Sequence, residues 1–303
     1  MNALVLENVS KSFGSTQAVR NLDLRVDQGG IYGLLGPNGA GKTTTIRMIM
    51  DIIAPDSGRI EILGSPSPAA VKDRLGYLPE ERGLYRKMKV LQTLKYFAAI
   101  KGVQGNQLER RATQWIEQLD LKSWAYRKVE ELSRGMQQKL QFAIACINEP
   151  ELLILDEPFA GLDPVNLDVV KGIVTDFRRR GTAILLSTHM MHEAEQLCDY
   201  ILLINKGQAV LEGNLEQLRS RWPANSVVAE LEGQTDFLEA LSFVSGVRRD
   251  GPGTEIFLHD GADPQELLKA MVSRVRVKSF RLKSLTLHEI FVRTVGGEDA
   301  QNP

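Results

Sequence analysis

Apolar residues along this chain follow two spacings, one typical of strands and one typical of helices. Residues 3–10 and 22–26 alternate apolar and polar positions, which predicts two half-buried strands joined by a turn around Gly14. Continuous apolar runs predict buried strands at 31–35, 152–155 and 183–187, and a further strand is expected at 59–63. Because predicted helices such as 165–179 separate these strands, we expect a mostly parallel sheet covered on both faces.

A helical block interrupts this order. Apolar residues between 90 and 147 recur at helical spacing, and Asn106 is a candidate cap for one of the helices. The block lies between strand-rich segments. We therefore expect a helical subdomain at about residues 88–147.

The last part of the chain has a different order of elements. A hairpin around 205–207 and a helix over 215–222 precede the predicted linker at 223–226. Beyond the linker, the pattern predicts strands at 227–231, 243–248, 255–258 and 275–282, helices at 236–241, 264–272 and 285–294, and a turn at 250–253. The order βαββαβ is that of a small ferredoxin-like module. We therefore divide the chain into domains at 1–222 and 226–303, the second a small α+β domain.

Length, composition and charge agree with a two-domain globular protein. The chain has 303 residues, of which 43% are hydrophobic and 25% charged, and its net charge of −1 provides no basic excess, so no nucleic-acid partner is expected. Cys146 and Cys198 lack metal-binding spacing, and we expect both to be small buried side chains in a reducing cytosol. The N-terminus does not resemble a signal peptide, and no apolar run is long enough to span a bilayer. If a membrane is involved, another polypeptide must provide the membrane-spanning part.

A glycine-rich segment follows the predicted strand 31–35 directly. Residues 36–43 match the pattern G-x-x-x-x-G-K-S/T of phosphate-binding loops, in which glycines let the backbone wrap a polyphosphate with its N–H groups pointing inward. Lys42 can place its charge against the β and γ phosphates, the Thr43 hydroxyl can ligate Mg²⁺, and a helix predicted over 43–53 presents its N-terminus to the phosphates. We expect this loop to bind a nucleoside triphosphate. The residues expected to do so are Gly36, Pro37, Asn38, Gly39, Ala40, Gly41, Lys42, Thr43 and Thr44.

Polar residues also follow the other buried strands. Asp156 and Glu157 come after 152–155, and His189 comes after 183–187. Ligands of parallel sheets gather at the carboxyl ends of the strands, so we expect these residues to share one site with the phosphate loop. Asp156 can hold the Mg²⁺ shell, and Glu157 beside it can orient and deprotonate an attacking water. Phe13, in the first predicted turn, is equally suited to stacking on adenine and to anchoring a local core.

Five segments in this order resemble the motifs of the ATP-binding subunit of ABC transporters. They are the phosphate loop, Leu132–Gln138 (Leu-Ser-Arg-Gly-Met-Gln-Gln), Leu152–Glu157, Ala160–Asp163 and His189, and the likeness covers residues 1 to about 220. The resemblance implies a P-loop NTPase of ABC type, with a mixed, mostly parallel sheet and a helical subdomain, and ATP and Mg²⁺ as cofactors. The segments Tyr77–Tyr85 and Leu132–Met136 and the C-terminal module are similar to those of exporter ATPases grouped with sodium-extrusion systems.

The resemblance also implies roles for particular residues. His189 is implied to be the switch histidine at the γ-phosphate, in a catalytic set with Lys42 and Glu157. The segment Leu132–Gln138 is implied to be the signature that contacts ATP on the opposite subunit. From the residues alone, Ser133 and the Gly135 amide form either an anion-binding helix start or a plain cap. The nucleotide contacts implied outside the phosphate loop are Ser133, Gly135, Met136 and Asp163.

Two positions depart from the family pattern. Arg134 stands where the signature has its first glycine, and Glu80 stands where the family has a metal-contacting glutamine. A carboxylate is a good Mg²⁺ ligand, although it adds negative charge near the γ-phosphate. We expect Glu80 to contact the metal with Thr43 and Asp156, and to couple the nucleotide state to a partner.

The function implied is ATP hydrolysis in the nucleotide-binding subunit of an ABC transporter. Two such subunits, identical or related, are expected to dimerise around MgATP and to energise a separate integral-membrane permease of an exporter. The chain would then lie at the cytoplasmic face of the membrane, with the permease docked near residues 79–88. The alternative is a soluble ABC-type ATPase acting on ribosomes or DNA, but the chain has one phosphate loop and no heptad run. Residues 226–303 can act as a sensor or as a dimer clamp, and the cargo and its direction are left open.

Overall fold

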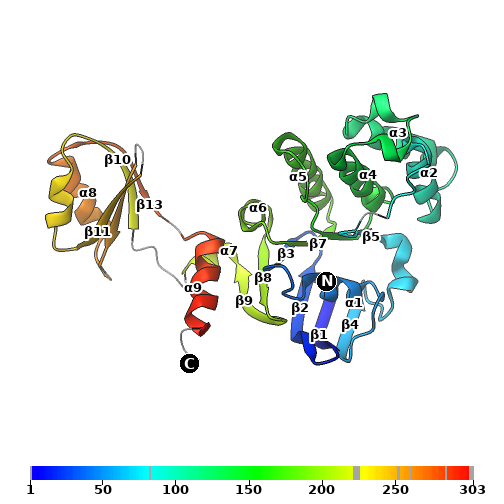
Figure 1. Ribbon diagram of the computed structural model, residues 1–303, viewed down its shortest axis with the longest axis horizontal. Coiled ribbons are helices and arrows are strands. Elements are labelled where there is room, and N and C mark those ends of the chain that lie inside the picture. Colours follow the sequence, from blue (N-terminus) through cyan, green and yellow to red (C-terminus); the bar gives the residue numbers. More distant parts are fainter. Residues whose placement is uncertain are drawn as a thin grey trace. The chain divides into compact units, whose positions relative to one another are not determined.

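The chain divides into two compact units. The structure, a computed structural model, describes residues 2–81, 83–220, 226–250, 253–259, 261–283 and 285–299. One unit comprises residues 1–215 and 294–303, and the other comprises residues 216–293 (Figure 1). Positions 221–225 at the predicted domain boundary lie outside the described residues, as do positions 251 and 252 of the predicted turn and Arg82 of the segment Tyr77–Tyr85.

A six-stranded sheet forms the centre of the first unit. Its order is β5-β6-β7-β3-β8-β9, and all neighbours are parallel except the β8–β9 hairpin. The strands are β5 (Leu75–Leu78), β6 (Leu152–Asp156), β7 (Ala183–Thr188), β3 (Ile31–Leu35), β8 (Tyr200–Asn205) and β9 (Gln208–Asn214). Every residue of β6 and β7 is buried, as continuous apolar runs require in a sheet covered on both faces. The predicted mostly parallel sheet is confirmed.

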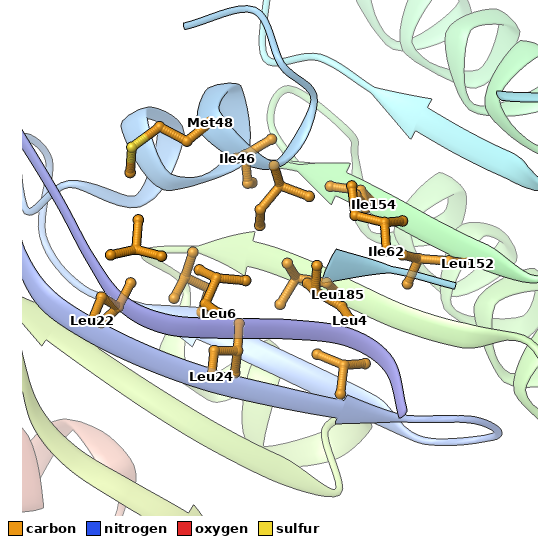
Figure 2. Close-up of a cluster of buried hydrophobic side chains, with 14 of the residues drawn as sticks. Leu4, Leu6, Leu22, Leu24, Ile46, Met48, Ile62, Leu152, Ile154 and Leu185 are labelled. Carbon is orange, nitrogen blue, oxygen red and sulfur yellow. The ribbon is translucent and has the colours of Figure 1, made fainter. Parts of the chain in front are cut away.

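A second, antiparallel sheet packs against one face of the first. It has the order β2-β1-β4, with β1 at Asn2–Phe13, β2 at Thr16–Asp27 and β4 at Ser57–Ile62. Figure 2 shows the core between the two sheets, where side chains from β1 and β2 meet those of α1 (Lys42–Ile49), β6 and β7. The helix α1 ends at Ile49, four residues before the predicted end at 53.

Helices cover the opposite face and form the separate block. The helices α5 (Pro164–Arg179) and α6 (Met191–Leu197) lie over the sheet, while α2 (Val90–Ile100), α3 (Asn106–Gln118) and α4 (Arg134–Cys146) form the block (Figure 1). Short 3₁₀ turns lie at Pro68–Arg74, Lys122–Trp124 and Val129–Glu131. The predicted cap at Asn106 is wrong. Gly105 caps α3 with φ 59°, a conformation that glycine adopts without steric cost, and Asn106 is the first helical residue.

The register of the parallel strands brings their carboxyl ends to one edge. Leu35 pairs with Thr188, Asp156 pairs with Ser187, and Leu78 pairs with Leu155. The segments that follow β3, β5, β6 and β7 therefore leave the sheet side by side. This edge carries the phosphate loop, Glu80, Glu157 and His189.

The second unit contains a four-stranded antiparallel sheet of order β11-β12-β10-β13. The strands are β10 (Ser226–Glu232), β11 (Val244–Asp250), β12 (Gly253–Leu258) and β13 (Arg276–Leu282), and the helix α8 (Pro264–Val272) lies wholly within this unit. The division assigns Leu215 of α7 (Leu215–Ser220) and residues 294–299 of α9 (Leu287–Asp299) to the first unit. The first helix of the predicted βαββαβ order is a 3₁₀ turn at Asp236–Ala240, too short for an α-helix of several turns. Apolar residues of β10, β12 and α8 share one core.

Candidate active site

The glycines of the phosphate loop meet different constraints. Gly36 has φ 154° and a Cβ there would lie 2.2 Å from the Ile204 carbonyl oxygen, while Gly41 has φ 111° and a Cβ there would lie 2.5 Å from the Ala18 carbonyl oxygen. Gly39 has φ 78°, but a Cβ there would have no neighbour within 4 Å. Close backbone packing therefore requires Gly36 and Gly41, whereas only the dihedral angle favours glycine at 39.

Lys42 is folded into the loop that it follows. Its Nζ donates to the carbonyl oxygens of Gly36 at 2.8 Å and Pro37 at 3.1 Å, and it lies 3.8 Å from Glu157 Oε1. Only 6% of the residue is exposed. An ammonium group has three donors, so the loop fixes this charge at the centre of the site.

A hollow of about 180 Å³ opens beside Lys42. It is lined by Ala18, Asn38, Gly39, Gly41, Lys42, Thr43, Thr44, Glu80 and Glu157. Ala18 of β2 was not predicted, because only the fold places β2 against the phosphate loop. Phe13 is not among the lining residues. Its side chain, at the end of β1, is 52% exposed and its ring centre lies 5.7 Å from Lys11 Nζ.

Asp156 is fully buried at the end of β6. Its Oδ1 accepts a hydrogen bond from the Ser187 hydroxyl and lies 3.5 Å from Thr43 Oγ1, whereas its Oδ2 is buried without a hydrogen-bond partner. Burial raises the pKa of this carboxyl, and the charges of Glu80 and Glu157 raise it further, against the lowering effect of the two hydroxyls. The ionised carboxylate of Asp156 therefore lacks a hydrogen-bond partner at one of its two oxygens.

The oxygens around Asp156 suit a hard cation. Thr43 Oγ1 also lies 3.2 Å from Glu80 Oε2, so one hydroxyl and two carboxylates converge. Magnesium prefers one or two carboxylates together with phosphate oxygens and water. No cluster of three or more His, Cys, Asp or Glu side chains in the described part of the chain could hold a metal by itself. The unpaired Asp156 Oδ2 and this donor set therefore fit Mg²⁺ held jointly with a nucleotide.

Glu157 and His189 are in direct contact. Glu157 Oε1 lies 2.9 Å from His189 Nδ1, and Glu157 Oε2 accepts a hydrogen bond from Thr188 Oγ1 at 3.3 Å. Glu157 has φ 49°, a rare conformation for a side chain of this size, and its amide donates to the Ser187 carbonyl oxygen at 3.1 Å. A carboxylate held in this way can orient a water molecule and accept its proton. Ser187 and Thr188 were not predicted, because their roles depend on the register of β6 and β7.

The signature residues lie outside the hollow. Ser133 caps α4 by accepting a hydrogen bond from the Met136 amide at 3.3 Å, and Asp163 caps α5 by accepting one from the Asn166 amide at 3.0 Å. A Cβ at Gly135 would meet only ordinary contacts, with the Gly161 carbonyl oxygen at 3.5 Å. Within this chain Ser133 and Asp163 cap helices, and neither they nor Gly135 and Met136 line the hollow at Lys42.

Two buried glutamines connect α4 with the segments that follow Glu157 and Glu80. Gln138 Nε2 donates to the Pro158 carbonyl oxygen at 3.3 Å, and Gln141 Nε2 donates to the Glu81 carbonyl oxygen at 3.4 Å. These links were not predicted. They join the helix that starts at the signature to both sides of the site.

Each of the two units matches the sequence profile of a known protein family. The sequence profile of the ABC transporter family matches residues 19–160, and the profile of the C-terminal domain of DrrA1-3-like ATP-binding proteins matches residues 213–295. Of the helices in the described ranges, none combines the length and apolar character needed to cross a bilayer.

Individual proteins resemble the chain over nearly its whole length. It is 37% identical to the ABC transporter ATP-binding protein YhaQ of Bacillus subtilis (strain 168), over 97% of this chain and 98% of that protein. It is 34% identical to the Nod factor export ATP-binding protein I of Cupriavidus pinatubonensis, over 97% of this chain and 91% of that protein. A solved structure of the ATP-binding subunit of an ABC transporter superposes with a TM-score of 0.68 and 30% identity, covering 73% of this chain and 93% of that one.

Proposed function

Because this chain belongs to the family of ABC transporter ATP-binding proteins, we propose that it is the ATPase of an exporter and energises a separate integral-membrane permease. Members of this family bind and hydrolyse ATP, and the hollow at Lys42 is the place where the triphosphate would lie. The export function named for the relative from Cupriavidus pinatubonensis supports the direction of transport.

The residues at the edge of the sheet have distinct tasks in hydrolysis. The loop amides and Lys42 would hold the β and γ phosphates, while Thr43, Asp156 and Glu80 would hold Mg²⁺. When bound, Mg²⁺ would neutralise charge that develops on the phosphates. Glu157 would orient the water and accept its proton. His189, in contact with Glu157 Oε1 at 2.9 Å, would fix the position of that carboxylate and contact the γ-phosphate.

One observation carries the proposal that two subunits act together. Ser133, Gly135 and Met136 stand at the start of α4, where a helix N-terminus attracts anions, yet the nucleotide hollow of the same chain does not include them. A second subunit placed head to tail would bring its own α4 to this hollow. ATP would then hold the two subunits together until hydrolysis releases them.

A groove between the sheet and the helical block supports the docking of a permease. Its volume is about 530 Å³, and apolar side chains such as Leu75, Leu84, Phe97, Ile100 and Ile144 contribute to its lining. The groove adjoins the segment between Glu80 and α2, within the predicted docking range 79–88. Gln141, which also lines it, donates to the carbonyl oxygen of Glu81. A docked segment would therefore be connected to the nucleotide site.

The substitution Glu157→Gln tests this proposal. We expect hydrolysis to fall by at least a hundredfold, because an amide cannot accept the proton of water, while ATP binding persists. ATP should convert the variant to a dimer in size-exclusion chromatography, and Ser133→Arg in the same background should prevent dimerisation. Retained turnover, or a monomer with bound ATP, would contradict the proposed roles. The chain should also co-purify with a hydrophobic integral subunit from its native membrane.

The identity of the exporter is a separate hypothesis. The likeness of residues 77–85 to sodium-extrusion ATPases favours sodium, whereas a relative is named for Nod factor export. Transport assays with the co-purified permease would distinguish these cargoes. The alternative of a soluble ATPase acting on ribosomes or DNA is not favoured, because the named relatives are transporter subunits.

A further inference from the structure

Beside the apolar groove, the surface of the helical block combines cations with exposed tyrosines. We name this surface the basic-aromatic rim. It consists of Tyr85, Arg86, Lys87, Lys89, Tyr96 and Tyr126. All six side chains are exposed.

Backbone contacts hold the two segments of the rim together. The Val90 amide donates to the Arg127 carbonyl oxygen at 3.0 Å, and the Val129 amide donates to the Met88 carbonyl oxygen at 2.9 Å. Lys89 and Lys128 form an isolated antiparallel bridge. The segment that carries Arg86, Lys87 and Lys89 therefore lies next to the segment that carries Tyr126.

The rim carries positive charge that the protein does not neutralise. The neighbouring cations Arg127 and Lys128 form ion pairs with Glu131 and Glu130, at 3.6 and 3.5 Å. By contrast, Arg86, Lys87 and Lys89 have no carboxylate within ion-pair distance among the described residues. Three exposed charges of one sign thus stand on a chain whose net charge is −1. A patch of this kind attracts an anionic surface.

The tyrosines add apolar area with polar ends. Tyr126 is 74% exposed, Tyr85 is 51% exposed and Tyr96 is 42% exposed. Tyr85 packs edge-on against Tyr96 with ring centres 5.5 Å apart, and it stacks on Phe97, which lines the groove, at 5.9 Å. Tyrosine side chains are enriched at the interface between a membrane and water, where the ring and the hydroxyl meet different environments.

We propose that the basic-aromatic rim binds the anionic phospholipid headgroups of the membrane that surrounds the permease. The inference deepens the proposed function, since the groove assigned to the permease is continuous with the rim through Tyr85 and Phe97. Lysine and arginine would contact the lipid phosphates while the tyrosines enter the headgroup layer. The contact is weak by itself and adds to the binding of the permease.

Vesicle sedimentation of the full chain, without a permease, tests this inference. Each cation near an anionic membrane surface contributes about fivefold in partition, so three give on the order of a hundredfold preference for vesicles that contain phosphatidylglycerol over vesicles of phosphatidylcholine alone. The triple variant Arg86→Gln, Lys87→Gln, Lys89→Gln should lose this preference, as should the native chain at about 1 M salt, where charges are screened within about 3 Å.

A matched variant controls for the loss of charge. Arg25, Arg110 and Arg281 are exposed, and none has a carboxylate within ion-pair distance among the described residues. Replacing these three with glutamine should leave the preference for anionic vesicles unchanged. A separate variant, Tyr126→Ser, should weaken binding by a smaller factor that persists in high salt. Both triple variants should keep the thermal unfolding midpoint of the native chain.

Specific results would overturn the inference. An equal loss in both triple variants would show a general charge effect, and equal binding to both kinds of vesicle would exclude recognition of headgroups. An oligonucleotide that binds the rim and releases the chain from vesicles would identify a nucleic-acid site instead. These results would not affect the dimerisation of Glu157→Gln or the capture of a permease, so the proposed function stands or falls separately.

Discussion

The buried carboxylate of Asp156 should make the protein less stable than it would be with a neutral side chain. Its Oδ2 has no hydrogen-bond partner, and an unsatisfied buried polar group costs about 1–3 kcal/mol, with more for a charged one. In Asp156→Asn, the amide oxygen still accepts a hydrogen bond from Ser187 and the amide nitrogen takes the unpartnered place. Because a neutral group costs less to bury, we expect a gain of about 1 kcal/mol in the free energy of unfolding.

The pH dependence follows from the direction of the pKa shift. Burial raises the pKa of Asp156 from its ordinary value, so the folded protein binds a proton more tightly than the unfolded chain. Stability is therefore highest below the ordinary pKa and falls as pH rises through the folded-state pKa. The Asn variant lacks this contribution, and its advantage should grow across the same pH range.

The substitution Asp156→Asn should weaken the binding of MgATP even though it stabilises the protein. The Asn variant loses a carboxylate from the group expected to hold Mg²⁺, so MgATP should stabilise the native chain more than the variant. The assay is urea denaturation of the first unit with and without MgATP, followed through its own transition because the chain has two units. Asp168→Asn is the matched control, since Asp168 is exposed on α5 and forms no ion pair among the described residues. A destabilised Asp156→Asn protein, or equal stabilisation of both proteins by MgATP, would refute the reasoning.

Three further substitutions test the phosphate loop and the second unit. Gly36→Ala should prevent stable folding of the loop, because its Cβ would lie 2.2 Å from a backbone oxygen. Gly39→Ala should cost only about 1–2 kcal/mol, from its dihedral angle alone. Thermal unfolding of both variants measures this contrast, and equal losses of stability would contradict it. Glu255→Gln should cost about 1–2 kcal/mol, because Glu255 is 6% exposed and accepts a hydrogen bond from Lys283 at 2.8 Å. Burial raises the pKa of Glu255, but the hydrogen bonds and charges of Lys283 and Arg248 together outweigh burial and leave the pKa lowered. This stability should therefore be lost as pH falls through the folded-state pKa, which urea titrations of the native and variant proteins measure. A variant with the native pH profile would be inconsistent with this network.

Residues whose environment is set by their immediate neighbours could be predicted from the sequence. The apolar run Leu152–Leu155 predicts a buried strand, and the structure buries all four residues. The phosphate-loop pattern predicts glycines there, and Gly36, Gly39 and Gly41 all have a positive φ. Residues that act across the fold could not be predicted in this way. Thr188 reaches Glu157 only because β6 and β7 pair in one register, and Ala18 reaches the hollow only because β2 crosses the loop. Similarly, Gly105 replaced Asn106 as the cap because the connection before α3 needs a positive φ, which the side-chain pattern does not reveal.

The charges around the hollow explain why ATP would need a cation to bind here. Glu80, Asp156 and Glu157 bring three carboxylates to the same edge, while Lys42 is the one cation among the residues that line the hollow. A triphosphate adds several more negative charges at short distances, where each unscreened like-charge pair costs on the order of 1–4 kcal/mol. Thr43, Asp156 and Glu80 would hold Mg²⁺, and its two positive charges would offset both the repulsion and the burial of the unpartnered Asp156 Oδ2. Because Glu80 carries a charge that a glutamine would not, this chain should depend on Mg²⁺ for nucleotide binding more strongly than a relative with glutamine at this position.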